Sequence, residues 1–266
     1  MKKKKVMIAI VVFLLILLII TIAWYLDDQS KNYSKLEVSD SLIAMQNNYE
    51  EEFETEGFTI DNPNIILNPY HISPLTALVI FETETEVSPH VTIVGKDEHT
   101  TYNQTFSKGT KHLLPIYGLY PNYENEVIIE YTIDNQKISK TLSIQTDKLP
   151  DDFILPTSVT SSKEDLSNEL YFFSPSSKGY TCAYDINGDV RWYLTTNALW
   201  DISRLENGHM LISTERRVNS PYYMTGLYEI DLLGKIYVEY SLPGGYHHDY
   251  DELPKGNLLV ATHDFN

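Results

Sequence analysis

The sequence is short of cysteine and of basic residues. Cys182 is its single cysteine, so no disulfide can form within the chain, and no C-x-x-C pattern offers a zinc site. We expect Cys182 to be a small buried apolar residue. Lysine and arginine number 20 against 37 acidic residues, which gives a net charge of −17. Because phosphate recognition needs a basic face, this balance argues against nucleic acid as a partner.

Charge is also missing from residues 6–23, which follow the four lysines Lys2 to Lys5. At about 1.5 Å per residue, residues 6–26 would cross a hydrocarbon layer of roughly 30 Å. The run is long for a signal-peptide core and no A-x-A site follows it, which favours an uncleaved single-pass anchor over residues 1–26. The lysines favour a cytoplasmic N-terminus and an extracellular body at the cell membrane.

What the sequence does contain is β-sheet material. Residues 27–57 form a polar, acidic spacer, and residues 58–147 hold about seven short strand signals with a hairpin punctuated by Asp134 and Asn135. This pattern is typical of an antiparallel β-sandwich of the immunoglobulin or fibronectin type. The region shows no nucleophile, metal cluster or glycine-rich loop. Its histidines are expected at the surface: His71, His90, His99 and His112.

Residues 148–266 follow a proline-containing boundary and show an internal repeat. Placing Gly208 on Gly256 aligns WDISRLENGHMLIST with HDYDELPKGNLLVAT without a gap, a period of 48 residues. Four short strands per 40 to 50 residues is the pattern of a β-propeller blade, of which fewer than two periods are present. We therefore predict the first blades of a truncated propeller, with the two glycines in matching turns of adjacent blades.

The segment YHHDYD leaves three alternatives open for His247 and His248. They could be structural, since neighbouring strand residues point to opposite faces and rarely serve one site. They could bind zinc or manganese, although no third ligand is identifiable. They could also bind an anion or transfer a group. Asp201 and Asp249 are expected to share a structural role, holding donors where their strands begin.

Two motifs of the repeat, YHHDYDELPKGNLLVATHD and WDISRLENGHMLIST, occur after two sandwich motifs, NPYHISPLTALVIFETETEVSPHVTIVGK and HLLPIYGLYPNYENEVIIEY. In this order they resemble the bacterial aryl-sulfate sulfotransferases, a family that does not use an activated nucleotide sulfate donor. The resemblance runs from about residue 62 to residue 266. It implies a sandwich followed by a propeller in an all-β fold.

The resemblance also implies an activity, the transfer of a sulfuryl group from a phenolic sulfate ester to a phenol through a sulfohistidine intermediate. One of His247 and His248 would bind and polarise the sulfuryl group, with the spacing to Asp249 favouring His247. The family's nucleophilic histidine lies in later blades, so this chain is expected to be an inactive fragment by itself. No cofactor or metal is expected, and a homodimer stays open. The alternative is a membrane-tethered extracellular binding or adhesion module without catalysis.

Overall fold

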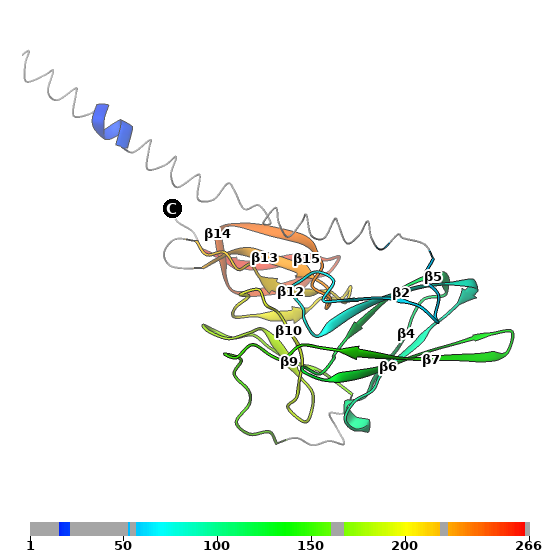
Figure 1. Ribbon diagram of the computed structural model, residues 1–266. Helices are drawn as coiled ribbons and strands as arrows, with labels where there is room; N and C mark the ends of the chain where they lie inside the picture. Colours follow the sequence, from blue (N-terminus) through cyan, green and yellow to red (C-terminus); the bar gives the residue numbers. More distant parts are fainter. Residues whose placement is uncertain (1–15, 22–52, 54–56, 161–167, 219–222, 264–266) are drawn as a thin grey trace, which may run out of the picture.

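The computed structural model describes residues 16–21, 53, 57–160, 168–218 and 223–263, and the ranges from residue 57 onward form a body built of β-strands (Figure 1). Its first half contains seven strands in two sheets. One sheet has the order β1-β2-β5 and the other the order β4-β3-β6-β7. The strands are β1 (Asn64–Leu67), β2 (Thr76–Val87), β3 (His90–Ile93), β4 (Tyr102–Thr105), β5 (Gly109–Tyr117), β6 (Glu124–Ile133) and β7 (Gln136–Gln145). The predicted number of strands and their antiparallel pairing are confirmed.

The two sheets enclose one hydrophobic core, because alternate residues along each strand face inward. Val127, Ile129 and Tyr131 of β6 lie in this core opposite alternate residues of β2. The other face of β2 is also covered, since Leu78 and Ile80 pack in a second cluster with Phe53. Phe53 is only 6% exposed, so this residue of the predicted spacer packs on the body.

The turn between β6 and β7 confirms the predicted hairpin. Asp134 and Asn135 have φ values of 47° and 64°, and Ile133 pairs with Gln136 across the turn. Two successive residues with positive φ match the twist of the flanking strands, and Asn and Asp tolerate this conformation better than most residues.

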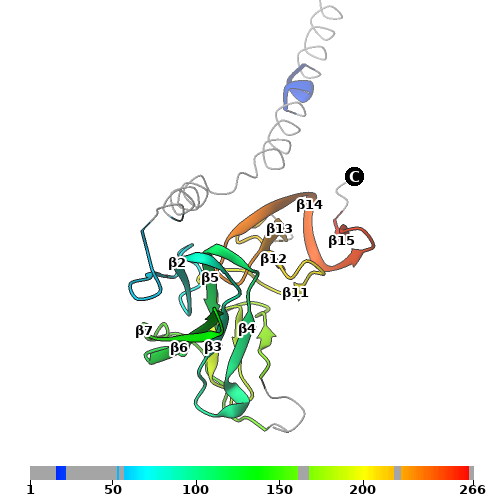
Figure 2. The same ribbon diagram turned by 90° about the vertical axis from the view of Figure 1, so that its right-hand side faces the viewer.

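The second half contains two further sheets, with orders β10-β9-β8 and β11-β12-β13-β14-β15. A short 3-10 helix, η1 (Glu98–Thr100), lies between β3 and β4 of the first half. The strands are β8 (Tyr171–Phe173), β9 (Cys182–Tyr184), β10 (Val190–Tyr193), β11 (Ile202–Arg204), β12 (Met210–Ser213), β13 (Met224–Ile230), β14 (Ile236–Leu253) and β15 (Asn257–Thr262). Figure 2 shows β14 as one long curved strand that carries β15 at its far end.

The five-stranded sheet is buried on both faces of its central strands. Met210 and Ile212 of β12 pack against Trp192 of β10, whereas Leu211 faces the opposite way and packs against β14 and β15. Leu259, the repeat partner of Leu211, is 59% exposed. Each layer of sheet therefore buries its apolar face only where a neighbouring layer covers it.

The 48-residue repeat is present in the backbone. Trp200 and His248 both have positive φ, 77° and 64°, and so do Gly208 and Gly256, 89° and 73°. Both segments belong to the five-stranded sheet β11-β12-β13-β14-β15. β14 is 18 residues long; its first part pairs with β13 and its last part pairs with β15, with shifts of register in both ladders.

The buried side chain of Arg191 joins the first and second halves. Arg191 of β10 is fully buried and binds Asp185 through Nη1 and Oδ2 at 3.0 Å. Its Nε donates to the carbonyl of Gly118 at 2.7 Å, and its guanidinium lies 3.8 Å from the ring centre of Tyr120. The core of the first two sheets also includes Cys182, which confirms its predicted burial.

One predicted surface histidine is buried. His112 of β5 is 3% exposed, and its ring lies 4.7 Å from that of Phe81. Its Nε2 shares a hydrogen bond of 3.0 Å with the Thr83 hydroxyl, and burial lowers its pKa. The prediction failed because His112 occupies an inward position of the β5 alternation, which places it in the layer that the sandwich sheets cover.

The predicted anchor and spacer lie outside the described residues, except for 16–21, which are helical, and for Phe53 and Gly57. Within the parts of the chain that the structure describes, we find no helix with the length and hydrophobicity needed to span a bilayer. The anchor over residues 1–26 therefore stays a prediction.

Candidate functional site

The side chains of His247 and His248 lie together near the middle of β14. Their ring centres are 4.9 Å apart at an interplanar angle of 78°. His247 is half-buried and His248 is exposed. The expectation that the two rings point to opposite faces of the strand is wrong.

The reason is the local backbone of β14. His248 has a positive φ of 64°, and the register with β15 shifts between Tyr246 and Tyr250. A bulge of this kind breaks the alternation of side chains, so two consecutive residues reach the same region. Sequence spacing alone assumes a regular strand and misses this effect.

Aromatic side chains surround the two imidazoles. The ring of Trp200 lies 4.2 Å from that of His248, and the ring of Tyr223 lies 4.3 Å from that of His247. His263 also approaches Tyr223, with ring centres 5.6 Å apart. The sequence singled out Trp200 through the repeat, but it gave no signal for Tyr223 and left His263 outside the site. We call His247, His248, Trp200, Tyr223 and His263 the histidine cluster.

Two glycines allow the chain to place this cluster. Gly244 and Gly245 have φ values of 85° and 80°. A Cβ atom on Gly245 would lie 2.7 Å from the carbonyl oxygen of Met224, and one on Gly244 would meet the backbone of His263. Only glycine permits both the positive φ and this close approach of neighbouring strands.

Below the cluster, Tyr246 is fully buried and supports the start of the preceding repeat. Its hydroxyl donates to Asp201 at 3.5 Å, and burial raises the pKa of Tyr246 far above its usual value. Asp201 also accepts a hydrogen bond from the backbone N–H of Ile202, so it has the predicted structural role. Asp249 is exposed, and its carboxylate makes no hydrogen bond with another described residue, so the shared role is wrong for Asp249.

The arrangement suits an anion attached to a flat ring. Imidazole N–H groups can donate to anionic oxygens, and Trp and Tyr faces can hold an aromatic group. Among the residues that the structure describes, no three His, Cys, Asp or Glu side chains converge as a metal site would require. The metal alternative for His247 and His248 thus finds no third ligand there.

Comparisons with known proteins point to one family. A model of the arylsulfotransferase Ig-like domain matches residues 64–147, and the arylsulfotransferase (ASST) model matches residues 156–266, including the histidine cluster. The chain belongs to the arylsulfotransferase family. It is 22% identical to the arylsulfate sulfotransferase AssT of Lelliottia amnigena and 20% identical to that of Escherichia coli O6:H1.

Each of these two alignments covers 74% of this chain and 42% of the relative. The chain thus spans about two-fifths of the length of the curated relatives it matches. The family model that contains His247 and His248 begins at residue 156, so the site belongs to the arylsulfotransferase part and not to the Ig-like part.

Proposed function

We propose that this arylsulfotransferase family member takes part in moving a sulfuryl group from a phenolic sulfate ester to a phenol. The histidine cluster is the site that binds the ester. The observation that carries this proposal is the pair of imidazoles, 4.9 Å apart, held between Trp200 and Tyr223 within the matched region. The aromatic walls would hold the aryl ring and the imidazoles would face the sulfate.

In the proposed reaction a histidine nitrogen attacks sulfur while the sulfur–oxygen bond to the aryl group breaks. The bonding electrons leave with the phenolate oxygen, which takes a proton. A second phenol then loses its proton and attacks the sulfohistidine, forming the new ester and freeing the imidazole. His247 and His248 would donate to the sulfuryl oxygens, where negative charge is held during both steps. We assign the nucleophile to none of the described residues.

For the fold, we propose that the first half is an immunoglobulin-like sandwich and that the second half consists of propeller blades. Two hairpin turns support the blades. Gly188 donates to the carbonyl of Asp185 and Gly234 to that of Asp231, at 2.9 and 3.1 Å. These two turns are 46 residues apart in the sequence and connect β9 to β10 and β13 to β14. This spacing is close to the 48 residues of the other repeat, as expected for successive blades.

We also propose that the chain is anchored in the cell membrane with its N-terminus inside and its body outside. The lysine block before the uncharged run of residues 6–23 supports this orientation. Protease added to intact cells should digest the body and leave a short protected N-terminal piece. Recovery of a processed protein that begins near residue 27 would contradict the anchor.

The site can be tested by binding of 4-nitrophenyl sulfate to the full chain, measured by titration calorimetry. Replacing both histidines, His247→Ala with His248→Ala, should weaken binding about tenfold or more, the effect of losing one hydrogen bond to a charged group. His90→Ala, on β3 in the Ig-like part, is the matched control and should bind normally. Equal affinity of the double variant would overturn the proposed site.

A second measurement addresses the role of each histidine. Rapid mixing of the chain with excess 4-nitrophenyl sulfate should release no burst of 4-nitrophenolate, because His247 and His248 are proposed to polarise the ester. A burst equal to the protein concentration that disappears in His247→Ala or His248→Ala would identify that residue as a nucleophile instead.

A further inference from the structure

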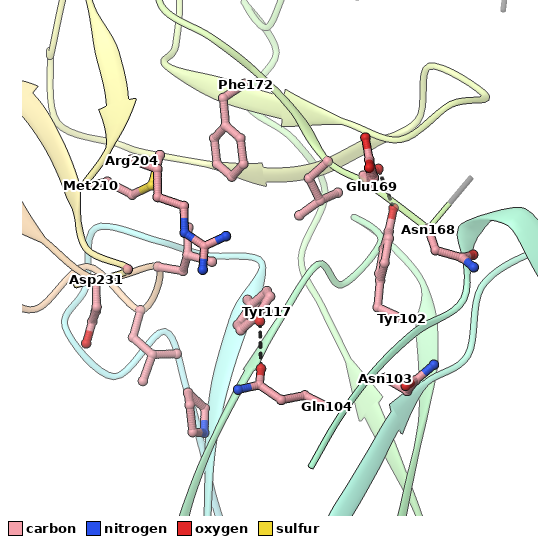
Figure 3. Close-up of a pocket in the computed structure, with 15 residues that line it drawn as sticks. Tyr102, Asn103, Gln104, Tyr117, Asn168, Glu169, Phe172, Arg204, Met210 and Asp231 are labelled. Carbon is pink, nitrogen blue, oxygen red and sulfur yellow. Dashed lines mark hydrogen bonds between the residues drawn. The ribbon is translucent and has the colours of Figure 1, made fainter. Parts of the chain in front are cut away.

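A cleft of about 770 Å³ lies where the Ig-like part meets the two later sheets (Figure 3). Its size is in the range of small-molecule sites. β4 and β5 form one wall and the later strands β8, β11 and β12 form the other. An apolar surface is contributed by Pro115, Leu170, Phe172, Met210, Leu232 and Leu233. A flat apolar group could therefore pack inside.

Arg204, the last residue of β11, brings the positive charge to this cleft. Its side chain projects into the space in Figure 3. Arg191 and Arg216 form ion pairs with carboxylates, whereas Arg204 forms no ion pair or hydrogen bond with any residue that the structure describes. Its Nη2 lies 3.7 Å from the position that a Cβ on Gly208 would occupy, so the guanidinium lies over the turn. A planar guanidinium without a partner is suited to bind an anion with two oxygens.

The cleft offers polar groups beside Arg204. The hydroxyl of Tyr117 donates to Oε1 of Gln104 at 2.8 Å, which fixes that amide and leaves its NH₂ group without a partner among the described residues. Burial raises the pKa of Tyr117 and the charge of Arg204 opposes this shift, so the two groups are close enough to interact electrostatically. Tyr117 stays a neutral phenol at physiological pH.

Neither of the two carboxylates that line the cleft, Asp231 and Glu169, forms an ion pair with Arg204. Asp231 uses Oδ1 to accept the backbone N–H of Lys235 at 3.0 Å and Oδ2 to accept the hydroxyl of Tyr237 at 3.1 Å. Burial raises the pKa of Asp231, and its hydrogen bonds to Lys235 and Tyr237 oppose this shift. Glu169 lies at the other side of the cleft, beside Tyr102 and Asn168 (Figure 3).

We propose that this cleft is a binding site for an aromatic monoanion, whose charged group binds Arg204 and whose ring packs on Phe172. Aryl sulfates and aryl carboxylates share this chemistry. The site is distinct from the histidine cluster, since no residue of that cluster lines the cleft. The proposal therefore holds whether or not the histidine cluster takes part in sulfuryl transfer.

The test is titration calorimetry of the full chain with three probes: 4-nitrophenyl sulfate, 4-nitrobenzoate and the neutral 4-nitroanisole. At least one anion should bind, and Arg204→Gln should weaken it about tenfold or more, since a charge-assisted bond is lost. Lys137→Gln removes one positive charge from β7, outside the cleft, and is the matched control. Tyr117→Phe keeps the ring and should weaken binding only a few-fold.

Folding is checked by melting each variant, and Arg204→Gln should melt like the original chain because Arg204 makes no ion pair or hydrogen bond with the described residues. 4-Nitrophenyl sulfate can also bind the histidine cluster, so its titrations are fitted with two sites. The variant with both His247→Ala and His248→Ala should lose the binding at the cluster and keep the binding that Arg204→Gln weakens. Binding of the sulfate alone or the carboxylate alone would support the site and define its anion. Equal affinity of Arg204→Gln for each anion, or equally tight binding of 4-nitroanisole, would overturn the proposal.

Discussion

Replacing Arg191 with methionine should destabilise the whole body of the protein. Methionine replaces the aliphatic part of the arginine side chain. It removes the guanidinium that binds Asp185, Gly118 and Thr100. Both members of the Arg191–Asp185 pair have side chains with 0% exposure. The variant would leave the carboxylate of Asp185 buried without its counter-ion, which is the costly way to break a buried pair.

The expected loss is about 3–5 kcal/mol in the free energy of unfolding. For a body of this size that loss corresponds to a melting temperature lower by roughly 6–20 °C. The assay is urea and thermal unfolding followed by far-ultraviolet circular dichroism. Lys96→Met is the matched control: Lys96 binds Asp189 of the same turn at 2.9 Å, but the two side chains are 45% and 35% exposed. An exposed pair contributes about 0–1 kcal/mol.

The double variant Arg191→Met with Asp185→Asn tests the cause. Asparagine keeps the Oδ1 that accepts the backbone N–H groups of Asn187 and Asp189, and it removes the buried charge. We expect the double variant to be more stable than Arg191→Met alone. Equal losses for Arg191→Met and Lys96→Met would refute the reasoning, because burial would then make no difference to the pair.

Two further predictions concern His112 and the glycine pair of β14. Burial lowers the pKa of His112, so below about pH 6.5 the unfolded chain binds the extra proton first and stability should fall as pH falls. His112→Phe should flatten this slope in urea melts, and an unchanged slope would contradict the assignment. Gly245→Ala should lower stability more than Gly256→Ala, because both have positive φ but only Gly245 has close neighbours; equal losses would show that the contacts at Gly245 do not matter.

The sequence predicted the strands of the first half well, because their apolar residues alternate. Val127, Ile129 and Tyr131 show the period directly, and Asp134-Asn135 marks the turn. Periodicity shows which face of a strand is apolar, but it does not show which element covers that face. The core of the first two sheets includes Cys182 and Val190, which lie beyond the predicted boundary at residues 147–158. Such contacts between distant segments have no local signal.

The site was predicted in part for a related reason. The internal repeat and the family resemblance pointed to His247 and His248, and the repeat also pointed to Trp200. Their geometry depends on positive φ at His248 and on Gly244 and Gly245, which a regular-strand assumption overlooks. Tyr223 precedes β13 and reaches the cluster only through the pairing of Met224 with Tyr246. Arg204 is a polar residue at a strand end, and only the fold shows that it lines the cleft without an ion pair or hydrogen bond to another described residue.

The strand β11 links the two proposed sites. Trp200 precedes it and contacts His248, whereas Arg204 ends it and lines the cleft. β11 is three residues long and, among the described strands, pairs with β12 alone. Trp200, with its positive φ, lies before it, and the turn that contains Gly208 follows it. A substitution that shifts this backbone would therefore disturb both sites. Side-chain changes such as Arg204→Gln and the paired histidine replacements leave the backbone in place, and their separate effects on binding are what distinguishes two sites from one.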